Sequence, residues 1–136
     1  LFRSVILGRS GYAILAGLAD VLHVRLQAPL DDRIELVRNA TNASLLEATA
    51  LVKENDKMRK AFVESFYRVP WESVLAFDIA LNTSRVPVNV ATDWVIQAAK
   101  LPPRNLDIRM TTKQLEVDAV MQQTVSEKLK CAIEHA

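Results

Sequence analysis

VLHVRLQAPLDDRIELV, residues 21–37, joins the pattern of a β-strand to the start of a helix. Apolar and polar side chains alternate over residues 21–28, which is the period of a half-buried strand. Pro29 lacks a backbone N–H and ends the strand. Asp31 and Asp32 then place negative charge in the first turn of a helix, where the helix dipole favours it. A strand that passes directly into a helix predicts an α/β fold.

A second strand and two more helices are predicted downstream. Ser44 and Glu47 have the spacing of a capping box, in which each side chain satisfies a backbone amide at the start of a helix. An apolar stripe then runs to about Phe66, so a long helix is expected. Residues 77–81 (FDIAL) suit a buried strand, and Pro87 suits the first turn of a final helix. The inward face of that helix is predicted to comprise Val90, Ala91, Trp94, Val95 and Ala98. This alternation indicates a parallel sheet.

The amino-terminal turn is the first candidate site. Residues 1–7 are largely apolar and lead into GRSG, residues 8–11, as expected of a buried strand that enters a tight turn. In parallel α/β sheets, ligands collect at the carboxyl ends of strands. Gly8 lets backbone amides approach a ligand, and Arg9 can hold a phosphate by charge-assisted hydrogen bonds. The spacing alone slightly favours the alternative, an arginine on a surface turn.

The charged face of the long helix is the second candidate. Asp56 is spaced to pair with Arg59 and with Lys60 along the helix. Charged helix faces usually point to water, and composition alone favours a solvated face laced with ion pairs. The same interpretation applies to Arg33 and Arg38 on the preceding helix.

The composition excludes several classes of protein. Half of the 136 residues are apolar and 24% are charged, which suits a globular chain that buries a core. The net charge of +1 gives no general reason to expect nucleic acid or an acidic membrane as partner. Cys131 is the single cysteine, so no cysteine pair suggests a zinc site, and neither His23 nor His135 is predicted to make a metal site. We find no membrane segment, and a reducing cytoplasmic location fits the cysteine content.

The pair Pro102-Pro103 is the best candidate for a domain boundary. A strand around residues 106–110 and a helix from about residue 118 are predicted beyond it. One strand and one helix cannot bury a core, so this tail packs elsewhere or belongs to a longer domain. The chain starts at Leu1 without a methionine, and truncation is therefore expected.

Four segments together resemble the latter half of the cytidylate kinase-like family. They are GRSGYAIL, VLHVRLQAPLDDRIELV, ENDKMRKAFVESFY and FDIALNTSRV, in the same order and at similar spacing over about residues 3–100. The resemblance implies a partial parallel-sheet P-loop nucleoside monophosphate kinase fold over residues 1–101, with a helical lid over about residues 33–67. The chain contains no G-x-x-x-x-G-K-[ST], the loop that holds the phosphates of the donor.

The resemblance also implies roles for individual residues. The Gly-Arg pair of the family, whose arginine contacts the nucleoside monophosphate, maps onto Gly8 and Arg9. The basic residues of the lid that close over the phosphates map onto Lys57 and Arg59. The implied contacts with the phosphate donor fall on Arg33, Asn82 and Thr83. Ser10 replaces the usual Asp or Gly, and KMRK at residues 57–60 is poorer in arginine than the usual lid, so the acceptor base stays open.

The family transfers a phosphoryl group from ATP, with Mg²⁺, to an acceptor such as CMP. Positioning and charge neutralisation do most of the work in such reactions. Without a P-loop the chain is expected to be inactive alone, so whether it is itself an enzyme stays open. Another possibility is that the chain is an incomplete reading frame with no activity of its own.

The tail resembles a different family. Residues 106–135 are similar to the first strand and helix of ribosome hibernation-promoting factors. The matching positions are Thr111, Lys113, Leu115, Glu116, Val117, Lys128, Leu129 and His135. This resemblance implies a second partial domain over residues 102–136 and a ribosome-associated, non-catalytic stress or interaction module as the alternative function. The other interpretation of the tail is an amphipathic strand and helix that cover the kinase-like sheet.

Overall fold

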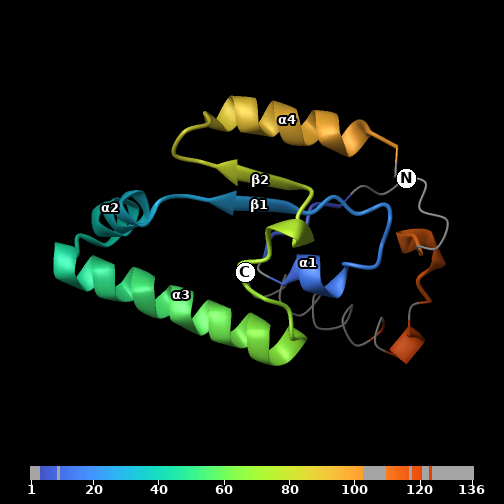
Figure 1. Ribbon diagram of the computed structural model, residues 1–136, viewed down its shortest axis with the longest axis horizontal. Helices are drawn as coiled ribbons and strands as arrows, with labels where there is room; N and C mark the ends of the chain where they lie inside the picture. The colour runs from blue at the N-terminus through green and yellow to red at the C-terminus, as the bar shows by residue number, and fades with distance from the viewer. Residues whose placement is uncertain (1–3, 9, 103–109, 117, 121–122, 124–136) are drawn as a thin grey trace.

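The fold is built round two short parallel strands, with helices on both sides of the pair (Figure 1). The computed structural model describes residues 4–8, 10–102, 110–116, 118–120 and 123. In chain order the elements are α1 (Gly11–Ile14), β1 (Val24–Gln27), α2 (Leu30–Thr41), α3 (Leu45–Tyr67), the 3-10 turn η1 (Val74–Ala76), β2 (Ile79–Asn82), α4 (Val88–Lys100) and η2 (Thr112–Gln114). β1 runs parallel to β2, with Val24 opposite Ile79 and Gln27 opposite Asn82. Both carboxyl ends therefore lie at one edge of the sheet, and the predicted α/β class is confirmed.

α2 and α3 form a helical hairpin that corresponds to the predicted lid segment (Figure 1). Asn42, which follows α2, has a left-handed backbone with φ 52°, a conformation that asparagine adopts more readily than most residues. Ser44 and Glu47 form the predicted capping box, in which the Ser44 amide donates to Glu47 Oε2 over 2.8 Å. Ile34 of α2 is buried against Ala48 of α3. The hairpin therefore has a small apolar core of its own.

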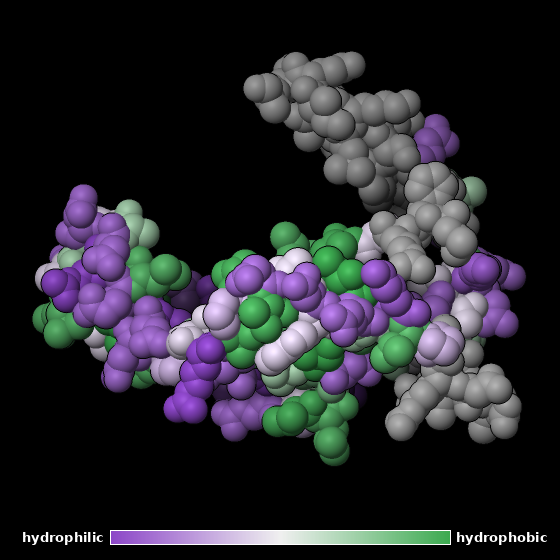
Figure 2. Space-filling model, turned by 90° about the horizontal axis from the view of Figure 1, so that it is seen from above, coloured by the Kyte–Doolittle hydropathy of each residue, from purple (hydrophilic) through white to green (hydrophobic). Residues whose placement is uncertain are grey.

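α4 lies beside β2, on the side of the strands away from α3 (Figure 1). Pro87 immediately precedes it, as predicted. Of the five residues predicted to face inward, Val90, Ala91, Val95 and Ala98 are partly buried. Trp94, which was also predicted to face inward, keeps 50% of its surface exposed. Seen from the α4 side, apolar side chains gather along the middle of the molecule and hydrophilic ones towards the α2 end (Figure 2).

None of the helices in the described part of the chain is both long enough and apolar enough to cross a membrane.

The strand predicted over residues 1–7 does not form in the part that the structure describes. Residues 4–8 have no regular structure, and the sheet consists of β1 and β2 in the described chain. Val5 and Leu7 are 89% and 91% exposed. The apolar pattern alone was misleading, because a strand also needs a neighbouring strand to satisfy its backbone groups.

The start of the tail contacts the loop that follows α1. The Ala19 amide donates to the Met110 carbonyl over 2.9 Å. The Asp20 carboxylate accepts from the Thr112 amide at 2.8 Å and from the Thr112 hydroxyl at 2.5 Å. Most of the strand predicted at residues 106–110, and of the helix after it, lies outside the described residues. The domain boundary at the proline pair stays a prediction.

Candidate functional site

An acidic side chain on α3 joins the two helices of the hairpin. Asp56 accepts two hydrogen bonds from Arg33 Nη1, at 2.9 Å through Oδ1 and 2.7 Å through Oδ2. Arg59 Nη1 lies 4.0 Å from Asp56 Oδ1, one helical turn along α3. The side chains of Arg33, Asp56 and Arg59 are 34%, 35% and 33% exposed. Two arginines from different helices therefore pair with one carboxylate, which is only partly exposed to solvent.

The other charged residues of α3 behave differently. Lys57 is exposed and lies on the same stretch of the helix. Lys60, which the spacing placed with Asp56, has its Nζ 3.6 Å from Glu72 Oε1 instead. The expected face was a solvated one laced with ion pairs; Asp56 and Arg59 do pair there, and about a third of each side chain is exposed. The spacing of Asp56 and Arg59 was correct, but it could not reveal Arg33 as the closer partner.

The predicted donor-side residues Asn82 and Thr83 lie at the carboxyl edge of the sheet, where ligands bind in folds of this kind. The Thr83 amide donates to the Gln27 carbonyl over 2.9 Å, which extends the pairing of the two strands by one residue. The Thr83 hydroxyl donates to the same carbonyl over 3.3 Å. Asn82 Oδ1 accepts from the Ser84 amide over 3.0 Å. Both residues therefore shape this edge, and a ligand role for them stays a prediction.

The structure describes only part of the predicted acceptor turn. Gly8 is exposed, and a Cβ added to it would meet nothing within 4 Å. Its neighbour Arg9 lies outside the described residues. The roles of Gly8 and Arg9 stay predictions.

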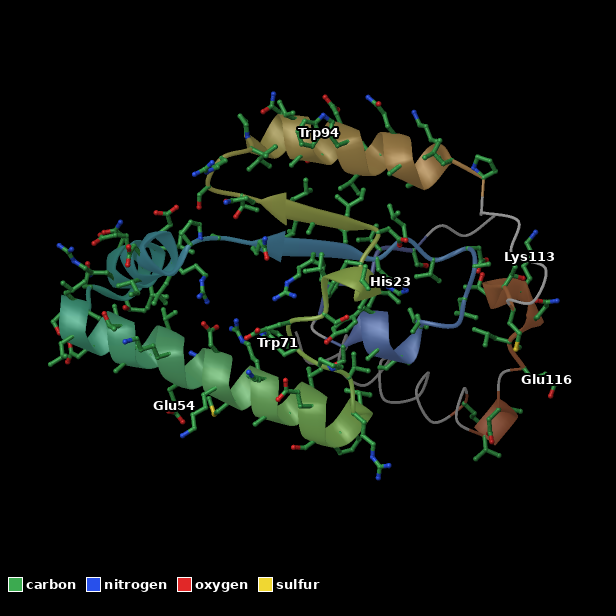
Figure 3. The ribbon with its side chains drawn as sticks, in the orientation of Figure 1. His23, Glu54, Trp71, Trp94, Lys113 and Glu116 are labelled. Carbon is green, nitrogen blue, oxygen red and sulfur yellow. The ribbon has the colours of Figure 1, made fainter. Side chains whose placement is uncertain are left out.

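Sequence reasoning missed a cluster at the far end of α3, where the chain turns back towards β2 (Figure 3). Arg25 of β1 donates from Nη1 to the Trp71 carbonyl over 3.2 Å, and its guanidinium lies 5.6 Å from the Trp71 ring and 5.4 Å from the Phe77 ring. Glu64 of α3 accepts from the Trp71 amide over 3.2 Å. Burial raises the pKa of the neighbouring Tyr12 hydroxyl, and the positive charge of Arg25 opposes this. The period-two pattern placed Arg25 on the polar side of β1, but it did not identify the aromatic partners.

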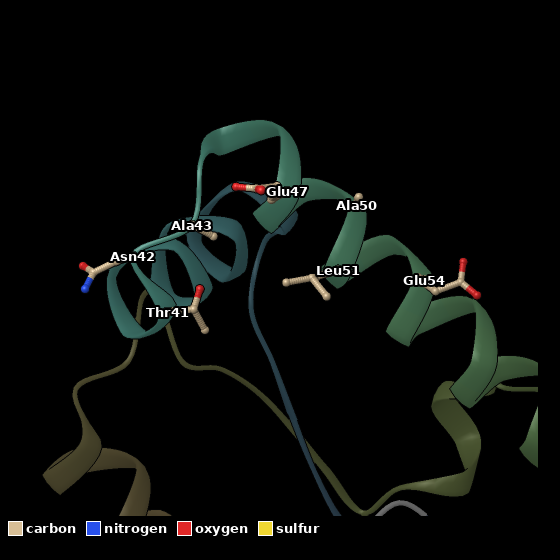
Figure 4. Close-up of a pocket in the computed structure, with 7 residues that line it drawn as sticks. All are labelled: Thr41, Asn42, Ala43, Glu47, Ala50, Leu51 and Glu54. Atoms are coloured by element: carbon tan, nitrogen blue, oxygen red, sulfur yellow. The ribbon is translucent and has the colours of Figure 1, made fainter.

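A depression at the corner between α2 and α3 is lined by Thr41, Asn42, Ala43, Glu47, Ala50, Leu51 and Glu54 (Figure 4). None of the predicted site residues belongs to it. The carboxylates of Glu47 and Glu54 repel a phosphate, so this hollow does not suit a nucleotide. The candidate site is therefore the group formed by Arg33, Asp56 and Arg59.

The sequence profile of the cytidylate kinase-like family matches residues 2–85, which is more than half of the chain. The chain belongs to the cytidylate kinase-like family. The matched residues contain β1, the whole hairpin and β2, so the candidate site falls inside the family region. Membership confirms the predicted resemblance to this family over residues 2–85. The family generally uses ATP and Mg²⁺.

Two further proteins are similar to this cytidylate kinase-like chain. A uronate isomerase of Corynebacterium glutamicum is 28% identical over 100 residues, which cover 72% of this chain and 19% of that protein. The crystal structure of an uncharacterized protein from Eubacterium ventriosum matches with a TM-score of 0.60 and 26% identity, over 68% of this chain and 51% of that one. The chain therefore spans about a fifth of the first relative and about half of the second.

The resemblance of the tail to ribosome hibernation-promoting factors stays a prediction. The family match ends at residue 85, before the tail begins. Most of residues 106–135 lie outside the described part of the chain.

Proposed function

We propose that this chain supplies the acceptor turn and the phosphate-binding lid of a nucleoside monophosphate kinase-like phosphotransferase. Its substrates are a CMP-like monophosphate and ATP, in line with the family. The sequence has no P-loop motif, so the chain binds nucleotide without transferring phosphate on its own.

This proposal rests on the ion pairs that Arg33 and Arg59 both make with the carboxylate of Asp56. Phosphoryl transfer spreads negative charge over the oxygens of the moving group, and fixed cations stabilise that charge. Guanidinium groups suit this role because they donate paired hydrogen bonds to phosphate and keep their charge at any working pH. Lys57, exposed beside them, adds a further positive charge.

The remaining assignments follow the family pattern. Arg9, with Gly8, holds the acceptor monophosphate, and Arg33, Asn82 and Thr83 contact the donor nucleotide. Mg²⁺ neutralises the donor phosphates when it is bound. The described residues contain no cluster of three metal-ligating side chains, so we assign no Mg²⁺ ligand among them.

Isothermal titration calorimetry with CMP and with ATP tests the proposal on the full chain. Arg9→Ala should weaken CMP binding by about tenfold, and Arg59→Gln should weaken binding of both nucleotides by a similar factor, because each removes a charge-assisted hydrogen bond. The matched control is Arg38→Gln, since Arg38 lies on the same hairpin but pairs with Glu35. It should stay within about twofold of wild type.

A folded wild-type chain that binds neither nucleotide would contradict the proposal. Equal losses in Arg59→Gln and Arg38→Gln would also contradict it, because they would show that only the general positive charge of the hairpin matters.

A further inference from the structure

Two positively charged side chains lie near the same carboxylate at the candidate site, and the sequence pattern does not explain this proximity. Arg33 comes from α2 and Arg59 from α3, and guanidinium groups at short range repel one another. Asp56 lies between them, 2.7 Å from Arg33 Nη1 and 4.0 Å from Arg59 Nη1. Its carboxylate is therefore the group that offsets the repulsion.

The arrangement leaves donor capacity for a further anion. A guanidinium has five N–H donors, and the contact of Arg33 with Asp56 uses Nη1. Arg59 lies 4.0 Å from the same carboxylate, and 33% of its side chain is exposed, so part of its guanidinium-bearing side chain is open to solvent. Two cations and one carboxylate also leave a surplus positive charge, which suits a tetrahedral phosphate with several acceptor oxygens.

We infer that Asp56 is a positioning residue, which holds Arg33 and Arg59 side by side so that both guanidinium groups bind one phosphate group. The inference rests on the proposed function and adds to it the residue that organises the lid. Asp56 itself does not touch the phosphate. It acts through the two arginines. Removing its negative charge should therefore weaken anion binding, although charge alone predicts tighter binding.

That sign gives a sharp test with inorganic pyrophosphate as the probe. Asp56→Asn and the control Glu54→Gln each remove one negative charge from α3, and Glu54 is exposed (Figure 3). Coulomb attraction alone predicts that both changes tighten anion binding. Positioning predicts that Asp56→Asn weakens pyrophosphate binding by about tenfold while Glu54→Gln stays within about twofold. Binding to Asp56→Asn as tight as to Glu54→Gln would overturn the inference.

A double-mutant cycle separates positioning from a purely structural role. In the Arg33→Gln background, Asp56→Asn should cost less than about threefold, because its main partner is already gone. The same tenfold loss in that background would overturn the inference in favour of a general effect on the hairpin. Asp56→Glu keeps the charge and should bind within about threefold of wild type, so it tests the idea even if Asp56→Asn does not fold. A loss in Asp56→Glu as large as the one expected for Asp56→Asn would count against it.

The two proposals fail in distinguishable ways. A wild-type chain that is folded but binds no CMP, ATP or pyrophosphate overturns both. A wild-type chain that binds them while Asp56→Asn binds equally well overturns only the role of Asp56.

Discussion

Replacing Ile34 with alanine should show how much the apolar core of the hairpin contributes to the stability of the chain. Ile34 is 6% exposed and is buried in one cluster with Ala48 and Val52. Buried Ile→Ala changes cost roughly 2–5 kcal/mol, and the cost is lowest where neighbours can collapse into the space. The cluster has only three buried members in the described residues, so its neighbours can relax. We therefore expect a loss at the lower end, about 2 kcal/mol.

The measurement is urea unfolding followed by far-ultraviolet circular dichroism. With a urea slope of roughly 1–3 kcal/mol per molar, a loss of this size lowers the midpoint by about 1 M. Leu36→Ala is the matched control, because Leu36 lies on the same helix but is 72% exposed. It should change stability by less than about 0.5 kcal/mol. Equal shifts for the two variants would refute the assignment of Ile34 to a core.

Two other predictions concern the carboxylates that cap turns. Hydrogen bonds from Ser44 lower the pKa of Glu47, so the capping box contributes stability at neutral pH that is lost as the pH falls through that lowered value. The gap in unfolding midpoint between wild type and Ser44→Ala should therefore narrow in acid, and a constant gap would argue against the box. Hydrogen bonds from Thr112 likewise lower the pKa of Asp20, and its contribution is lost as the pH falls through that lowered value. Asp20→Asn should speed amide hydrogen exchange at Thr112, and unchanged exchange would mean that this contact does not hold the tail.

Local sequence signals predicted the elements of the hairpin well. The capping box at Ser44 and Glu47 forms as expected, because it depends only on residues three positions apart. The strand predicted over residues 21–28 is shorter, at Val24–Gln27, because strand length is set by the partner strand as well as by the pattern. The strand predicted over residues 1–7 is absent from the described residues 4–8 for the same reason.

The sequence pointed to the charged residues of the candidate site, but it did not predict that Arg33 pairs with Asp56. Asp56 and Arg59 are close in sequence, so their spacing revealed them. The closer partner, Arg33, is on another helix, and its contact depends on how α2 packs against α3. The contact of Arg25 with Trp71 is also long-range, and no periodicity encodes it. Single-sequence patterns describe neighbours along the chain, whereas both contacts arise from tertiary packing.

The short connection between α2 and α3 has a consequence for the order of folding. The hairpin contacts join residues that are near in sequence, such as Ile34 and Ala48, whereas the parallel pairing joins Val24 to Ile79 across the entire hairpin. Closing a longer loop costs more entropy, and local contacts form faster than distant ones. We therefore expect the hairpin to form first and to bring the ends of the two strands towards each other. Slowing its formation should delay the appearance of the sheet, so the hairpin would serve as the folding nucleus of the domain.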